Sequence, residues 1–292
     1  MRFGGRRTSS NVESGGSRGG FGLPMGGGGI RLGGGGLGCG GIVLLIVISL
    51  VFGINPMSLI EGGPSGVPHG QPAPGGETPE DICGADQVTR FSCQVLASTE
   101  DRWTELFAAA GQRYRPPTLR FYRGGDMSAC GAAQSAMGPF YCPADRRIFL
   151  DTSFFEELAQ RFEAPGDFAQ AYVIAHEVGH HIQNLDGTNE RVRAMQARAG
   201  RAEGNRLSVA MELQADCLAG VWAATEKSAW EPGDVEEGLR AASAIGDDRL
   251  QQQSQGYAVP ESFTHGSSEQ RMQWLQRGMR SGDPASCDTF GG

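Results

Sequence analysis

The sequence predicts an α+β domain, mainly helical with a small sheet, behind a single N-terminal transmembrane helix. Three observations support this fold class. Apolar residues recur at the helical spacing of three and four positions through much of the second half of the chain. Two short stretches rich in β-branched and aromatic residues lie among these helical segments. One uncharged apolar run, the only one of its length in the 292 residues, precedes them all.

Residues 1–36 are dominated by glycine and arginine. They hold 15 of the 46 glycines of the chain, and they carry five arginines against one acidic residue, Glu13. Because such a segment has little apolar surface to bury, we predict that it is disordered.

Residues 37–54 are uncharged and mostly apolar, and they are long enough to cross a bilayer as one helix. The alternatives are a cleaved signal peptide and a buried core helix. The long basic flank and the lack of a small-x-small cleavage pattern disfavour the first, and the glycines around Gly40 disfavour the second. Arginines precede the run, whereas Glu61 and Glu77 follow it, so we expect a cytoplasmic N-terminus and an outer C-terminal part.

Residues 55–82 are rich in proline, glycine and serine, which predicts a flexible linker. The remaining residues, 83–292, are enough for one domain with a substantial core. From residue 55 onward the chain has 20 basic and 32 acidic residues, a net charge of about −12. Nucleic acid is therefore not expected as a partner.

Six of the seven cysteines lie in the predicted outer domain, and the seventh, Cys39, lies in the apolar run. An even number in an oxidising compartment predicts disulfides. Free thiols or a cysteine metal site are the alternative, which the absence of a C-x-x-C spacing disfavours. Proximity favours pairing Cys83 with Cys93 and Cys130 with Cys142, which leaves Cys217 with Cys287.

The elements of the outer domain follow from periodicity and from start and stop residues. A helix with the sequence AYVIAHEVGHHIQNL should begin near Phe168, because Asp167 followed by Gln170 is a capping-box arrangement, and Gly187 should end it. Its apolar stripe faces the core. The other expected elements are helices over 98–111, 153–162, 206–224 and 268–277, and strands over 118–123 (TLRFYR) and 147–151 (RIFLD).

The stretch HEVGHH carries the strongest chemical signal. His176 and His180 are four residues apart, so they lie on one face of the helix and can both bind one zinc ion. Glu177 lies beside them, where it can accept a proton from a water molecule that the metal activates. His181 projects about 100° further round the helix and is expected to pack rather than bind. The alternative is a surface helix whose histidines have their hydrogen bonds satisfied without a metal.

A catalytic zinc site needs a third protein ligand. Asp186 is one candidate, but Gln183 stands where a glycine turn would bend the chain back, so the helix should continue past it. The better candidate is Glu212, which with Asp216 forms a carboxylate pair four residues apart on an apolar helix. Burying that pair is costly unless Glu212 binds the metal and Asp216 accepts a hydrogen bond from a ligand histidine. An exposed carboxylate face is the alternative.

Two further features are candidates for a role in the site. His265, in the Gly/Ser-flanked loop SFTHGSSEQR, could hydrogen-bond a developing oxyanion, although a lone loop histidine is often simply solvated. Residues 188–205 are charged and helix-prone and lie between the two ligand helices, so we hypothesise that they cover the cleft.

The motifs GPFYCPAD, AHEVGHH, MELQADCLAGVW, AIGDDRLQQQSQG and SFTHGSSEQR together resemble the YpfJ-type neutral zinc metallopeptidases of bacterial membranes. The chain is also similar, more distantly, to the zincins that include the HtpX peptidases. The resemblance implies a zincin-like domain with one Zn²⁺ held by His176, His180 and Glu212, and with Glu177 as catalytic base. Asp216 falls at the aspartate that supports a ligand histidine. The HtpX-like pattern has proline after the late histidine, where this chain has Gly266.

The resemblance implies peptide hydrolysis at a bacterial inner membrane, with the peptidase domain periplasmic or extracellular. We expect an extended peptide or protein substrate to pair with an edge strand, either TLRFYR or RIFLD. The alternative is a zinc-binding, non-catalytic protein of the cell envelope that binds a partner. A membrane-anchored domain that binds no metal is the third reading.

Overall fold

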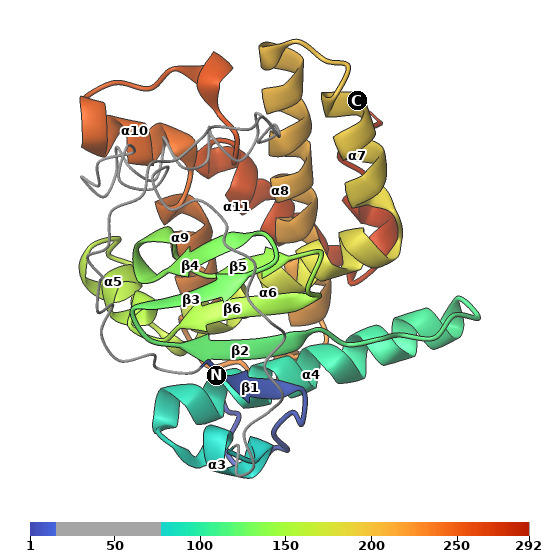
Figure 1. Cartoon of the computed structure of the whole chain (residues 1–292), viewed down its shortest axis with the longest axis vertical. Helices are drawn as coiled ribbons and strands as arrows, with labels where there is room; N and C mark the ends of the chain where they lie inside the picture. Colours follow the sequence, from blue (N-terminus) through green and yellow to red (C-terminus); the bar gives the residue numbers. More distant parts are fainter. Residues whose placement is uncertain (16–76, 292) are drawn as a thin grey trace, which may run out of the picture.

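A computed structural model describes residues 1–15 and 77–291, which form a small sheet with helices packed against it (Figure 1). The strands are β1 (Val12–Ser14), β2 (Thr118–Tyr122), β3 (Gly125–Ser128), β4 (Gly131–Gln134), β5 (Phe140–Cys142) and β6 (Arg147–Asp151). The helices are α3 (Pro79–Gly84), α4 (Gln87–Ala109), α5 (Phe154–Gln160), α6 (Asp167–Leu185), α7 (Thr188–Gln196), α8 (Arg201–Ala223), α9 (Asp234–Ala244), α10 (Asp247–Gln255) and α11 (Ser268–Ser281). The mixed α/β character, mainly helical with little sheet, agrees with the prediction.

The main sheet has the order β1-β2-β6-β5. Strands β1, β2 and β6 run parallel, and β5 runs antiparallel to β6. Strands β3 and β4 form a separate hairpin. The two predicted strands are therefore the interior strands of the main sheet, and β5 is an edge strand that contacts α6.

The first 15 residues are part of the packed domain, which corrects their assignment to a disordered segment. Strand β1 hydrogen-bonds to β2, and Phe3 is buried against Phe91, with ring centroids 5.5 Å apart. Glu13, the acid that composition singled out, accepts hydrogen bonds from Arg120 at 2.7 Å and from Arg147 at 2.9 Å. These contacts join the N-terminal segment to two strands that lie more than 100 residues further along the chain.

The N-terminal ammonium group of Met1 lies 2.6 Å from the carboxylate of Asp167 and 3.3 Å from that of Asp234. Helix α6 begins at Asp167, one residue before Phe168, as expected, but the predicted capping box is wrong. Gly166 is the N-cap, and Asp167 is the first residue of the helix and makes no capping hydrogen bond. The predicted capping box used local spacing alone, whereas the side chain of Asp167 is bound by a distant part of the chain.

The predicted single-span anchor is wrong for this fold. Strand β1 lies before the apolar run 37–54 and β2 lies after it, so a single membrane crossing by this run would put the two strands on opposite sides of the membrane. The two strands are instead hydrogen-bonded neighbours in one sheet. Among the described residues, none of the helices has the length and apolar character to span a bilayer. The run itself and residues 55–76 of the predicted linker lie outside the described residues. The linker also ends earlier than expected, because α3 begins at Pro79.

All three predicted disulfides are present: Cys83–Cys93, Cys130–Cys142 and Cys217–Cys287. The third joins α8 to the C-terminal turn, over a sequence separation of 70 residues. Helices α8 and α11 also pack closely, because glycines meet at their crossing. A Cβ atom on Gly278 would lie 1.9 Å from the carbonyl oxygen of Cys217, so no larger residue fits there without moving one of the helices.

The predicted helices are present with shifted ends. Helix α4 begins 11 residues before the expected 98–111, and α8 begins at Arg201 rather than near residue 206. The strand predicted over 147–151 has the same bounds as β6. Helix α6 continues through Gln183 to Leu185, as predicted from the absence of a glycine at position 183.

Candidate metal centre

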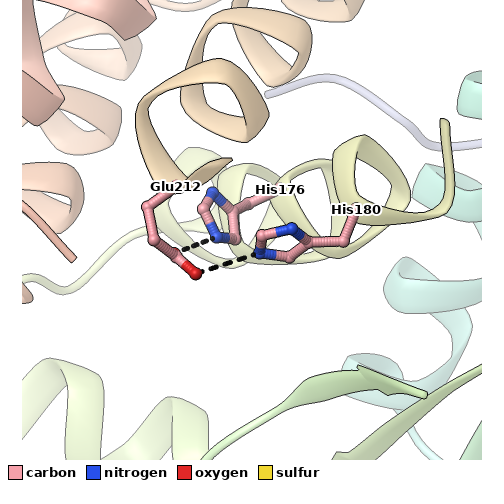
Figure 2. Close-up of side chains that lie close together, drawn as sticks. All are labelled: His176, His180 and Glu212. Carbon is pink, nitrogen blue, oxygen red and sulfur yellow. Dashed lines mark hydrogen bonds and ion pairs between the residues drawn. The ribbon is translucent and has the colours of Figure 1, made fainter. Parts of the chain in front are cut away.

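Three side chains from α6 and α8 converge on one point (Figure 2). His176 Nε2 lies 3.2 Å from one carboxylate oxygen of Glu212, and His180 Nε2 lies 3.5 Å from the other. One ligand atom from each of the three residues lies within 4.8 Å of the others. Two histidine nitrogens and a carboxylate oxygen are a donor set that zinc commonly takes in enzymes, so the residues present fit a zinc ion.

The close approach of α6 and α8 depends on Gly179, which lies between His176 and His180. A Cβ atom at this position would lie 2.9 Å from the backbone oxygen of Ala215. A glycine inside a helix costs about 0.5–1 kcal/mol relative to alanine. Here it lets the α8 backbone lie against α6, and Glu212, about one turn before Ala215, reaches both histidines.

Asp216 hydrogen-bonds to the ring nitrogen of His176 that does not face Glu212. Its Oδ1 accepts a hydrogen bond from His176 Nδ1 at 2.8 Å and another from the Tyr172 hydroxyl at 2.6 Å. Arg271, from α11, donates to both carboxylate oxygens, from Nε at 2.8 Å and from Nη2 at 2.9 Å. Asp216 and Arg271 are buried, so the pair is removed from water and holds the orientation of the ring.

The electrostatics of the cluster favour positive charge at the two histidines. Burial opposes a charge on His176, but Asp216 and Glu212 outweigh burial and raise the pKa of His176 to about 10. Burial similarly opposes a charge on His180, and Glu212 raises the pKa of that ring. The same carboxylates attract a divalent cation in place of the protons.

Glu177 is buried beside the two histidines, and it does not join the converging donors. Burial raises the pKa of its carboxyl, while the positive charges of His180 and His176 act in the opposite direction. The nearby backbone N–H of Tyr141, in the edge strand β5, also acts to lower this pKa. Glu177 thus lies in the wall of the cavity, close to both histidines and to the sheet edge.

A cavity of about 540 Å³ opens over these residues. His176, Glu177, His180 and Glu212 all line it, as does His265. Helices α5 and α10, the segments next to them, and Val173 of α6 contribute apolar side chains, and α7 contributes mainly polar ones. The apolar group includes Phe154, Phe162, Val173, Ile245 and Leu250, and α7 provides Asn189, Val192, Arg193 and Gln196.

The loop that carries His265 is held by Asp247, at the start of α10. One oxygen of Asp247 accepts backbone N–H groups from Thr264 and His265, each at 2.6 Å, and the other lies 3.2 Å from His265 Nδ1. Burial opposes a charge on His265, but the hydrogen bond to Asp247 and the charge of Glu212 raise its pKa. The ring therefore has a fixed position at the wall of the cavity.

Other candidates lie apart from the three converging donors. His181 is fully buried, its Nδ1 lies 2.9 Å from the Tyr141 hydroxyl, and its Nε2 donates to the carbonyl of Arg115 at 2.7 Å. Burial lowers the pKa of His181 to about 4, as expected for a neutral packing residue. Asp186 accepts the backbone N–H of Thr188 at 2.8 Å. The hypothesised cover is α7 and the start of α8, and one face of α7 does line the cavity.

The sequence did not single out several residues that support the site. Arg271 has the clearest missed signal, because Leu275 and Gly278 follow it at helical spacing and all three are buried on one face of α11. A charged residue in a buried stripe requires an ionic partner. Asp247 carried no such signal, since its partners Thr264 and His265 come from another part of the chain, and neither did Gln183, whose amide is oriented by residues of α8.

Comparison with known proteins identifies the family of the chain. Residues 1–290 match the model of a family described as "Putative neutral zinc metallopeptidase". The chain is 51% identical to the protein YpfJ of Escherichia coli over 300 residues, which cover 100% of this chain and 99% of that protein. It is 40% identical to the protein Rv2575 of Mycobacterium tuberculosis over 258 residues, which cover 83% and 85% of the two chains. No solved structure matches. The chain therefore belongs to the neutral zinc metallopeptidase family.

Proposed function

We propose that this protein is a zinc-dependent endopeptidase in which His176, His180 and Glu212 hold one zinc ion and Glu177 is the general base. The observation that carries the proposal is the convergence of three metal-binding side chains beside a buried glutamate, at the wall of a cavity of about 540 Å³. The family is one of zinc metallopeptidases, which makes a peptide the expected substrate.

A bound zinc ion supplies Lewis-acid chemistry: it polarises the substrate carbonyl and makes water a better nucleophile at neutral pH. The protein supplies the proton transfers. Glu177 takes a proton from the attacking water and delivers it to the leaving amine, and burial, which raises its pKa, suits both steps. Asp216 and Arg271 keep the ring of His176 in one orientation, with Nδ1 protonated and Nε2 facing Glu212.

The peptide is proposed to lie along the unpaired edge of β5. The two strands predicted for this role, TLRFYR and RIFLD, are β2 and β6, and each already has a neighbour on both sides. Strand β5 has one neighbour, and Pro139, Phe140 and Tyr141 line the cavity. An extended peptide added at a sheet edge places alternate side chains in pockets.

Three disulfides support an oxidising compartment as the site of action. We therefore propose that the folded domain works outside the bacterial cytoplasm. A periplasm and a cell exterior are both consistent with this proposal.

The proposed function is tested with the purified full-length chain. We expect about one zinc per chain by elemental analysis, and cleavage of a mixed peptide library that stops on chelation and returns on addition of zinc. Removal of the metal abolishes cleavage because neither the carbonyl nor the water is then activated. A chain that binds zinc and leaves the library and unfolded proteins intact would instead support a non-catalytic, partner-binding protein.

Replacing His265 with alanine is expected to lower kcat by about 10²–10³-fold, the usual loss when one oxyanion donor is removed. Zinc content should not change, because His265 is not among the three converging donors. Steady-state kinetics on a fluorogenic peptide, together with zinc analysis, measure both. Ser262→Ala in the same loop is the control, since the Ser262 hydroxyl bonds Val259 and Gln251 and does not line the cavity. Equal kcat values for the two variants would exclude the oxyanion role.

A further inference from the structure

The Nδ1 atoms of the two ligand histidines have hydrogen-bond partners of different kinds. His176 Nδ1 contacts a carboxylate, that of Asp216, whereas His180 Nδ1 lies 2.8 Å from the side-chain oxygen of a neutral amide, Gln183. In Figure 2 the second ring nitrogen of His180 is turned away from Glu212. Gln183 is fully buried and does not line the cavity, so neither solvent nor substrate explains its polar side chain.

The orientation of the Gln183 amide is fixed by its other contacts. Its nitrogen lies 2.7 Å from the backbone oxygen of Met211 and 3.0 Å from Oε1 of Gln214. A backbone carbonyl can only accept a hydrogen bond, so the NH₂ group of Gln183 must face Met211. The amide oxygen then faces His180, and His180 Nδ1 must carry the proton. The lone pair of the neutral ring is left on Nε2, the nitrogen that faces Glu212.

Gln214 continues the chain of hydrogen bonds toward the C-terminus. Its oxygen accepts from Gln183, and its nitrogen donates to the backbone oxygen of Cys287 at 3.1 Å. Cys287 is bonded to Cys217, three residues beyond Gln214 on α8. The disulfide therefore holds in place the carbonyl that orients Gln214.

We propose that Gln183 is a positioning residue for the metal centre: through Gln214 and the stapled C-terminal turn, it fixes the tautomer and direction of His180 and so sets the zinc affinity. The inference rests on the zinc ligands of the proposed function, and it requires no peptide cleavage. It assigns a purpose to the Cys217–Cys287 disulfide beyond holding two segments together.

The test measures the zinc affinity of the full chain by competition with a chromophoric chelator. Gln183→Leu keeps the volume and removes both hydrogen-bonding functions, and it should raise the Kd for zinc by about 10–100-fold, the usual effect of losing a partner that orients a ligand. Asn184→Leu is the matched control. Asn184 is the next residue on α6, and its side chain donates to the Tyr141 hydroxyl and to none of the three ligands. Thermal melting of the zinc-free proteins separates loss of affinity from loss of fold.

Gln183→Glu gives the rescue. Its carboxyl oxygen still accepts from His180 Nδ1, so its zinc affinity should lie closer to the wild-type value than that of Gln183→Leu. Gln214→Leu should weaken binding less, by several-fold, since it acts through Gln183. A Kd for Gln183→Leu within twofold of the Asn184→Leu value would overturn the proposal. So would a loss of zinc-binding free energy in Gln183→Leu that is matched by an equal loss in the stability of the zinc-free protein. An unchanged Kd in Gln214→Leu would overturn the link to the disulfide.

These outcomes are distinguishable from failure of the proposed function. A wild-type chain that binds zinc tightly and cleaves no peptide would refute the peptidase, while the ratio of Kd values between Gln183→Leu and Asn184→Leu would still decide the role of Gln183. A wild-type chain that binds no zinc would refute both.

Discussion

Replacing Glu177 with glutamine is expected to lower peptide turnover by about 10²–10⁴-fold, the contribution that a positioned general base makes. Glutamine has the same shape as the buried Glu177 side chain, so the structure should be preserved. It cannot accept a proton from the attacking water. The measurement is kcat/KM on a fluorogenic peptide, with zinc content determined on the same sample.

The control for this variant is Glu190→Gln, the same change at an exposed position on α7. It should cleave at the wild-type rate. Comparison of peptide fragments from cells that carry wild-type or Glu177→Gln protein extends the test to natural substrates. Identical fragment patterns, with zinc bound in both proteins, would support the non-catalytic alternative.

Replacing Arg271 with methionine is expected to lower the free energy of unfolding by about 3–5 kcal/mol, the usual effect of removing one member of a buried ion pair. Arg271 is 2% exposed and donates two hydrogen bonds to Asp216, which is fully buried. Methionine fills similar space, so the loss reports the charge. Asp216 would be left buried with only the polar contacts of Tyr172 and His176.

Urea denaturation of the zinc-free protein measures this loss without a contribution from metal binding. Arg277→Met, on the exposed side of α11, is the control: it removes a cation–π contact with the Trp274 ring, 4.8 Å away, and should lower stability by about 1 kcal/mol or less. Arg271→Lys should be intermediate, because an ammonium group cannot form the paired contact of a guanidinium. An Arg271→Met protein as stable as the wild type would show that Asp216 does not need its cation.

The sequence predicted α6 and α8 well because each has a long apolar stripe. It missed β1, β3, β4 and β5, which have only three or four residues, too few for a period to be recognised. It also misassigned the N-terminal segment, because the glycine content of residues 1–36 concealed the buried Phe3 and Val12 near their start. Pairing between β1 and β2 is non-local, and no local pattern reports it.

The candidate site divides in the same way. His176, Glu177 and His180 follow from local spacing, and Glu212 and Asp216 follow from the cost of two carboxylates on an apolar helix. The residues that orient them were not predicted, because Gln183 contacts residues of α8 and Arg271 comes from α11. These hydrogen-bond partners depend on which helices pack against each other, and helix packing cannot be predicted from the local pattern of a single sequence.

The contact between Gly179 and Ala215 has a consequence for recognising metal centres of this type. Two histidines four residues apart can occur on any helix by chance, but in this chain the missing side chain at Gly179 also lets α8 lie close enough for Glu212 to reach both of them. A motif that specifies glycine between the histidines and a small residue three positions after the distant glutamate therefore describes a spacing between two backbones. Such a motif should separate true centres from chance pairs of histidines better than the histidines alone.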